Sequence, residues 1–140
     1  MDVYDHYGFV TDRAVFEHCF HLQETELEGL KARNTIVSSC PTSNNFLGSG
    51  LFNFEKVSQH INRINFASGC GAGNTISMLR VMDDAYKVAM LSGYKLPSTL
   101  RWYLCTLDSA RALQIDDKAG NFEKIKKLIL LSLILKQQIF

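Results

Sequence analysis

The chain has 140 residues, of which 46% are hydrophobic and 21% charged, so it has the length and composition of one globular domain. Fifteen Lys and Arg residues against 14 Asp and Glu residues leave a formal net charge of +1, which gives no general attraction to nucleic acid or to acidic membranes. The four cysteines are widely spaced and lie in apolar runs, which indicates reduced, buried thiols.

Neither the beginning of the chain nor its most apolar stretch indicates export or membrane insertion. Met1-Asp-Val-Tyr-Asp-His6 has acids and aromatics where a signal peptide has a basic start and an apolar stretch. The run from Leu128 to Leu135 is far shorter than the ~20 residues that a membrane-spanning helix needs. We therefore expect a cytoplasmic protein that binds neither a membrane nor nucleic acid.

The first part of the chain predicts two strand and helix pairs. Residues 14–20 are rich in aromatic and apolar side chains and predict a strand. A helix is predicted over residues 24–33, with Leu27 and Leu30 on one face and Asn34 as a left-handed stop.

The β-branched segment 35–40 predicts a second strand, and Pro41 opens a polar, glycine-bearing loop that we expect to reach Gly50. A helical turn or two is predicted over residues 54–61.

A third strand is predicted over residues 64–68, followed by a glycine-rich turn, Gly69-Cys-Gly-Ala-Gly-Asn74. Thr75 is expected to cap the longest helix, and Gly93 to end it. The apolar residues that recur at helical spacing in this segment are Met78, Leu79, Met82, Ala85, Tyr86 and Ala89.

Two further helices are predicted after this segment. Pro97 suits the first turn of one, with Leu100, Leu104 and Leu107 on a single stripe, and residues 109–113 predict another short helix.

Strands that alternate with helices predict an α/β fold with parallel pairing, layered or barrel-like. In such folds, active sites gather at the carboxyl ends of the strands, here Phe20-His21, Cys40-Pro41 and Ser68-Gly69. A (β/α)₈ barrel typically needs about 250 residues, so this chain supplies only part of one.

The densest group of potential metal ligands is His18-Cys19-Phe20-His21. Residues three apart on a strand point to opposite faces, so His18 and His21 are not expected to share a metal. His18 alone favours a packed, hydrogen-bonded histidine, while His6 and His60 are expected on the surface.

The segment Gly69–Gly73 lacks the complete spacing of a nucleotide-binding motif, which favours a tight turn over an anion cradle. Asp83-Asp84 and Asp116-Asp117 are expected on a solvated helix face and in a turn.

Several segments, in order, together resemble guanine deaminase of the amidohydrolase superfamily. They are Asp2-Val-Tyr-Asp-His-Tyr-Gly8, Ala14-Val-Phe-Glu-His18, Cys40-Pro-Thr-Ser-Asn-Asn-Phe-Leu-Gly-Ser-Gly50, Ser77-Met-Leu79, Ala110-Arg-Ala-Leu113 and Gly120-Asn-Phe122. The resemblance runs from residue 2 to about residue 124, and the segment 40–50 is its most specific part.

The resemblance implies a zinc-dependent (β/α)₈ hydrolase that converts guanine and water to xanthine and ammonia, usually as a homodimer. It further implies that zinc is held by a His-x-His pair on strand one, a histidine on strand five and an aspartate on strand eight, with a proton-shuttling glutamate beside the strand-five histidine. Zinc lowers the pKa of its bound water to about 7. This family is unrelated to the cytidine-type zinc deaminases.

By this resemblance, the three predicted strands match strands six to eight of the barrel. His18 matches the histidine that faces the metal-bound water and the substrate, and Gly69 occupies the position of the zinc-binding aspartate. Strands one to five have no counterpart, so we expect a C-terminal fragment with no intact metal site, no bound cofactor and no activity alone. The residues that contact the substrate are not identified.

The chain divides into residues 1–124, which follow the family, and an apolar tail over residues 125–140, which departs from it. A reading of the tail one base out of step fits the family, so a frameshift is one hypothesis. An incomplete barrel leaves strand edges unpaired, which predicts weak stability and self-association. Two alternatives stay open: a subunit completed by a separate N-terminal half, and an interaction partner of an intact deaminase.

Overall fold

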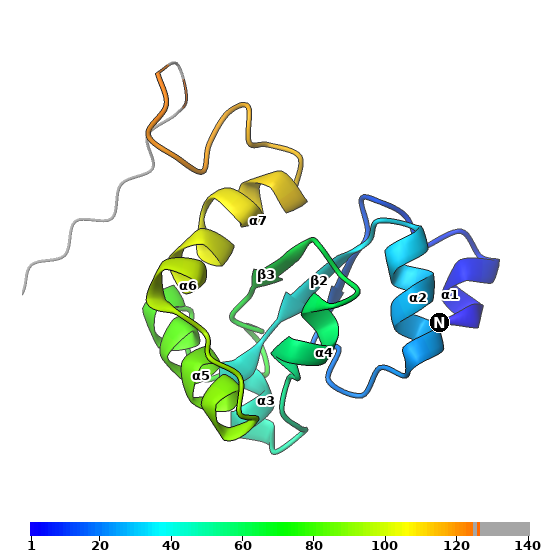
Figure 1. Ribbon diagram of the computed structural model, residues 1–140, viewed down its shortest axis with the longest axis horizontal. Helices are drawn as coiled ribbons and strands as arrows, with labels where there is room; N and C mark the ends of the chain where they lie inside the picture. The colour runs from blue at the N-terminus through cyan, green and yellow to red at the C-terminus, as the bar shows by residue number, and fades with distance from the viewer. Residues whose placement is uncertain (125, 127–140) are drawn as a thin grey trace, which may run out of the picture.

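A three-stranded parallel sheet forms the centre of the computed structural model, which describes residues 1–124 and 126 (Figure 1). The strands are β1 (Val15–Glu17), β2 (Ile36–Ser39) and β3 (Ile64–Phe66), and they lie side by side in that order. Val37 is aligned with Phe16 of β1 and with Ile64 of β3. The predicted α/β class with parallel pairing is therefore confirmed.

Seven helices surround the sheet in the described part of the chain. They are α1 (Asp2–His6), α2 (Glu24–Ala32), α3 (Pro41–Leu47), α4 (Phe54–Ser58), α5 (Met78–Leu91), α6 (Ser98–Cys105) and α7 (Leu107–Ala112). In Figure 1, α1 and α2 lie to the right of the sheet and α5 and α6 to its left. Among the described helices none is long and apolar enough to cross a bilayer.

A single hydrophobic core joins the sheet to α2, α4 and α5. Leu27 and Leu30 of α2 and Val81 of α5 are completely buried, as the predicted helical spacing of the leucines requires. All four residues of β2 are buried, which fits its place as the central strand.

Helix α2 begins at the predicted residue, Glu24, and ends at Ala32, one residue before the predicted end. The backbone N–H of Gln23 donates to the Glu26 carboxylate at 2.9 Å, as part of a capping box. Asn34 adopts a φ of 51° just beyond the helix, so the predicted left-handed stop is confirmed.

Helix α5 differs from its prediction in two details. Its N-cap is Ser77, and Thr75 instead accepts a hydrogen bond from the Ser77 N–H at 3.1 Å. Tyr86 is 40% exposed, because the buried face is centred on Val81, Ala85 and Val88. Gly93, with a φ of 75°, follows the helix as expected.

Helix α3 contradicts the loop predicted from Pro41 to Gly50. Pro41 takes the first helical position, which its fixed φ suits, and Gly48 ends the helix in the left-handed conformation at a φ of 65°. Thr42, Ser43 and Asn44 are buried. Polar composition indicated a loop, but these polar side chains face the interior of the fold.

At the other end of the strands, one arginine links several segments. The Arg63 guanidinium, directly before β3, donates to the carbonyl oxygens of Asp12 at 2.6 Å and of Asn34 at 2.9 Å. It also donates to the carbonyl oxygen of Ala112 at the end of α7. Hydrogen bonds from one side chain therefore tie together the segments that precede the three strands and the end of α7.

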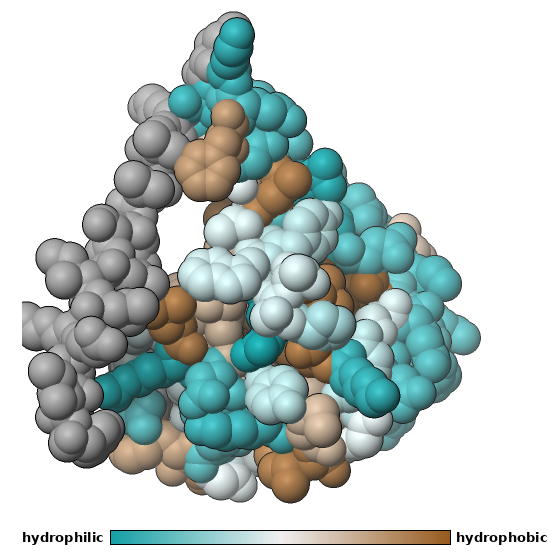
Figure 2. Space-filling view, turned by 60° about the vertical axis from the view of Figure 1, so that its left-hand side comes forward, coloured by the Kyte–Doolittle hydropathy of each residue, from teal (hydrophilic) through white to brown (hydrophobic). Residues whose placement is uncertain are grey.

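The surface shown in Figure 2 mixes hydrophobic and hydrophilic residues. An apolar groove of about 520 Å³ lies beside α7. It is bordered by Leu107, Ala110 and Leu113, and Cys105 is the one titratable side chain of its lining, so it lacks the groups of a catalytic site. The apolar tail over residues 125–140, and the frameshift suggested for it, lie outside the described residues apart from Lys126.

Candidate functional site

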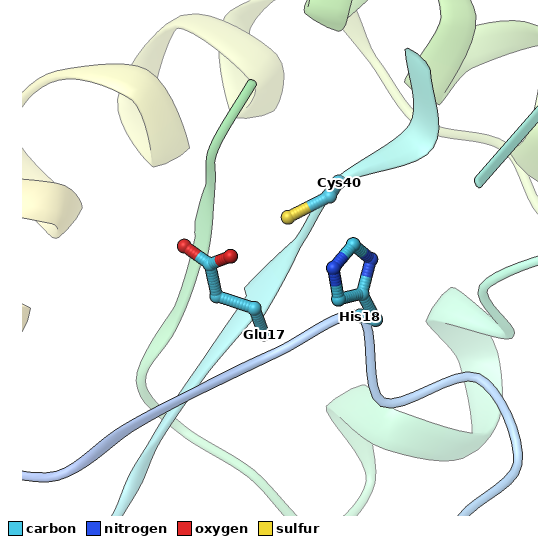
Figure 3. A group of neighbouring side chains, drawn as sticks. All are labelled: Glu17, His18 and Cys40. Carbon is cyan, nitrogen blue, oxygen red and sulfur yellow. The ribbon is translucent and has the colours of Figure 1, made fainter. Parts of the chain in front are cut away.

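Three potential ligands converge at the carboxyl ends of β1 and β2. Glu17 is the last residue of β1, His18 follows it, and Cys40 follows β2. One ligand atom from each residue lies within 4.8 Å of the other two, and the three side chains point toward one another in Figure 3. Within residues 1–124 and 126, no other group of three such side chains comes together.

The backbone directly after β1 produces this convergence. His18 and Cys19 adopt φ angles of 69° and 48°, in the left-handed region that residues with a side chain seldom occupy. The predicted strand over residues 14–20 therefore ends early, at Glu17. Hydrogen bonds hold the turn: His18 N–H donates to the Ser38 carbonyl and Cys19 N–H to the Glu17 carbonyl, both at 2.9 Å. Strained backbone of this kind clusters at functional sites.

Helix α3 supplies a fourth residue. The Nδ1 atom of His18 lies 2.6 Å from the Oδ1 atom of Asn44, and Asn44 is buried. The prediction of a packed, hydrogen-bonded histidine is confirmed for His18. Asn44 is not among the predicted site residues because the polar composition of its segment predicts a loop, although Pro41 and Gly48 at the two ends indicate a short helix.

The thiol of Cys40 is buried and protonated. Burial raises its pKa to about 11, and the negative charge of Glu17 adds to this effect, while the backbone N–H of His18 partly opposes it. A neutral thiol is a weak nucleophile, so Cys40 is not suited to covalent catalysis in this state.

The third strand end lies against the same helix. Gly69 adopts a φ of 60°, and a Cβ atom placed on it would lie 2.6 Å from the Ser43 Cβ and 3.5 Å from the Cys40 Cβ. The Thr42 hydroxyl also donates to the carbonyl oxygen of Ser68 at 3.4 Å. The ends of β2 and β3 therefore gather as the parallel fold predicts.

Other candidates stand apart from this cluster. His21 is not among the clustered ligands, which agrees with the prediction that it does not pair with His18. The expected surface position of His60 is wrong: its ring is largely buried, with Nε2 2.5 Å from a Glu24 carboxylate oxygen. The Gly69–Gly73 segment is a tight turn, since Gly73 N–H donates to the Gly69 carbonyl at 2.7 Å.

The remaining predictions concern acids and thiols. Asp83 and Asp84 lie on the solvated side of α5, where Lys87 bridges them at 2.6 and 3.5 Å. All four cysteines are free, as expected, but only Cys40 is buried. Cys19 and Cys105 are partly buried and Cys70 is exposed, so the expectation of a buried thiol is wrong at Cys70.

Comparison with known proteins identifies the class. The model of the amidohydrolase family matches residues 1–136, and the chain belongs to this family. Guanine deaminase of Escherichia coli strain K12 is 43% identical over 122 residues, and its solved structure superposes with a TM-score of 0.83 over 86% of this chain.

Two further solved structures are similar to this chain. A guanine deaminase from C. acetobutylicum with bound guanine is 29% identical, with a TM-score of 0.76 over 87% of the chain and 30% of that structure. An adenosine deaminase from Xanthomonas campestris with bound zinc is 26% identical, with a TM-score of 0.78 over 87% of the chain and 29% of that structure. The present chain resembles guanine deaminase but spans only 28% of the length of the Escherichia coli enzyme.

The described residues do not fit the zinc site that the family resemblance implies. By the resemblance, that site would need an aspartate at position 69, where this chain has glycine, and a Cβ there would lie 2.6 Å from the Ser43 Cβ, so a side chain would force Ser43 to shift. The ligands that do converge, Glu17, His18 and Cys40, are a different set of donors. We therefore derive no catalytic step through the family's zinc ion.

Proposed function

We propose that His18, Cys40 and Gly69, at the carboxyl ends of the three strands, form one wall of a guanine-deaminase active site. In this site β1, β2 and β3 correspond to strands six, seven and eight of a (β/α)₈ barrel. The reaction of the complete barrel is the hydrolysis of guanine to xanthine and ammonia. The observation that carries this proposal is that the carboxyl ends of the parallel strands place His18, Cys40 and Gly69 around one helix, α3.

In this proposal His18 faces the water and substrate of the complete site. Its Nδ1 atom contacts Asn44, so Nε2 is the nitrogen that remains for the reacting groups. Gly69 supplies no carboxylate, and we propose that the chain alone, which lacks an intact family zinc site, does not turn over guanine.

The first test assays the purified chain with added Zn²⁺ for xanthine formed from guanine. No xanthine is expected from the chain alone. Xanthine formation by the chain alone would contradict the proposed loss of activity.

The second test asks whether the wall is functional when a barrel is completed. The chain is co-expressed with the part of the Escherichia coli guanine deaminase that it does not match. In one arm the chain carries the substitution Gly69→Asp, and in the other it keeps Gly69. Xanthine formation that requires both the aspartate and His18, with His21→Ala as the matched control, would support the assignment of strands six to eight. Equal activity in His18→Ala and His21→Ala would refute the role of His18.

Completion by a separate N-terminal half, and docking on an intact deaminase, are two routes by which such a wall would reach a full site. The first route predicts that the chain co-purifies with the added part, and the second that it co-purifies with the intact Escherichia coli enzyme. Separate elution on size-exclusion chromatography would contradict the route whose partner was tested.

A further inference from the structure

We propose that Glu17, His18 and Cys40 bind one Zn²⁺ ion at the carboxyl ends of β1 and β2. This site is distinct from the zinc site implied by the family, because it uses neither Gly69 nor a His-x-His pair. It rests on three converging side chains from two neighbouring strands, held by a strained turn of the backbone.

The donor atoms suit zinc. A thiolate sulfur, an imidazole nitrogen and a carboxylate oxygen are its usual protein ligands, at about 2.0 to 2.3 Å from the metal. Ligands at those distances in a tetrahedron lie roughly 3.5 Å apart. The three atoms here lie within 4.8 Å of one another, so a shift of about 1 Å brings them into range. Glu17 is exposed and free to make that shift, whereas Cys40 is fixed in the core.

The surroundings of His18 also suit a metal ligand. A histidine that binds a metal generally donates its other ring N–H to a neighbouring acceptor, which fixes the ring and its tautomer. The Asn44 Oδ1 atom lies 2.6 Å from Nδ1, which leaves Nε2 for the metal. Figure 3 shows one ring nitrogen facing Cys40 and Glu17.

The proposed metal site gives a structural role to the left-handed backbone conformation at His18 and Cys19. In a regular strand, successive side chains point to opposite faces, which would separate Glu17 from His18. The left-handed conformation after Glu17 is what allows both side chains to reach Cys40. On metal binding the Cys40 S–H proton is released to solvent, and the thiolate sulfur becomes the ligand.

The experiment titrates the full-length, reduced chain with Co²⁺, a spectroscopic probe for zinc sites. We expect one equivalent of Co²⁺ to bind with a thiolate-to-cobalt charge-transfer band, and Zn²⁺ to displace it. Absence of this band in the parent chain would overturn the proposal.

Matched variants locate the site. Cys40→Ser is expected to abolish the band, while Cys105→Ser, at a partly buried thiol on α6, retains it. Glu17→Gln is expected to weaken Co²⁺ binding at least about tenfold, while Glu28→Gln, on the exposed side of α2, leaves it unchanged. Asn44→Ala is expected to weaken binding about 10- to 100-fold by removing the contact to the ring.

A band that persists in Cys40→Ser would overturn the proposal. If circular dichroism shows that Cys40→Ser does not fold, the Glu17→Gln variant becomes the deciding test of the site, because the exposed side chain of Glu17 is not part of the core. Affinity equal to that of the parent in Glu17→Gln would then reject the site. In the chain alone Nε2 of His18 binds the zinc ion, whereas in the completed barrel the same atom faces the reacting groups. The metal titrations involve no guanine and the xanthine assay of the completed barrel involves no Co²⁺, so failure of one proposal is distinguishable from failure of the other.

Discussion

The imidazole of His18 and the side-chain amide of Asn44 form a hydrogen bond of 2.6 Å between the end of β1 and helix α3. Because an amide oxygen can only accept, the contact assigns the donor role to Nδ1, and in the neutral ring the lone pair is then on Nε2. One buried amide thereby determines which nitrogen of the histidine is available for chemistry.

Replacing Asn44 with alanine tests this relationship. We expect a loss of about 1–3 kcal/mol in the free energy of unfolding, because the ring N–H loses its buried partner. Urea unfolding measures the loss, and nitrogen NMR of the imidazole measures the tautomer. Asn45→Ala is the matched control, since Asn45 is the next residue of α3 and is exposed. Equal effects of the two substitutions would show that the hydrogen bond stabilises nothing.

An aspartate at position 69 would lower the stability of the chain. The substitution Gly69→Asp places a Cβ 2.6 Å from the Ser43 Cβ and forces a side chain into a φ of 60°. We expect it to destabilise the chain by about 1–3 kcal/mol through strain and crowding, and to add no zinc site. Thermal unfolding and metal analysis measure both effects.

The matched control for this substitution is Gly29→Ala. Gly29 lies within α2 and has open space around its missing side chain, so alanine there is expected to be neutral or stabilising. The double variant Ser43→Gly with Gly69→Asp should recover part of the lost stability. A Gly69→Asp variant as stable as the parent, with an added equivalent of zinc, would refute the crowding.

The sequence predicted the parts of the fold that local rules govern. Leu27 and Leu30 lie on the buried face that their spacing indicates, and the β-branched run at Ile36 is the central strand. Composition does not predict helix α3, because two of its buried polar residues, Thr42 and Asn44, form hydrogen bonds to distant residues, Ser68 and His18. The cluster of Glu17 with Cys40 depends on a positive φ at His18, and no local pattern predicts that conformation for a histidine.

The outer edges of the sheet predict self-association. In the described residues, β1 and β3 each pair with β2 alone, so each leaves one row of backbone groups without a strand partner. We expect sedimentation velocity to show species that grow with protein concentration, and unfolding to be weakly cooperative. A monomer over the whole concentration range with one sharp transition would contradict this expectation.

Thiol reactivity should single out Cys70. It is the exposed cysteine of the four, while burial raises the pKa of Cys19 and Cys105 to about 12 and that of Cys40 to about 11. At pH 8 these three thiols hold almost no thiolate, so iodoacetamide should modify Cys70 first and the others only after unfolding. Mass spectrometry of the native chain measures the order, with Cys70→Ser as the control that removes the fast phase. Early modification of Cys40 would contradict its burial.

Asp108 is expected to make the fold less stable as the pH rises. An acid whose carboxylate is paired with a cation has the opposite effect. Burial raises the pKa of this carboxyl above its ordinary value of 3.8, and Tyr103, Arg111 and Arg63 offset the effect only in part. An acid whose pKa is raised on folding stabilises the fold below its unfolded pKa, and this stability is lost as the pH rises through the folded pKa. At neutral pH the buried carboxylate is therefore unfavourable.

The substitution Asp108→Asn keeps an oxygen that can accept from Tyr103 and removes the charge. We expect the melting temperature of Asp108→Asn to exceed that of the parent at pH 7, and the difference to shrink as the pH falls toward 3.8. Thermal unfolding across this range measures the difference, with Asp117→Asn, at an exposed acid in the turn after α7, as the control. A melting temperature lowered by Asp108→Asn at pH 7 would mean that the neighbouring arginines outweigh the cost of burial.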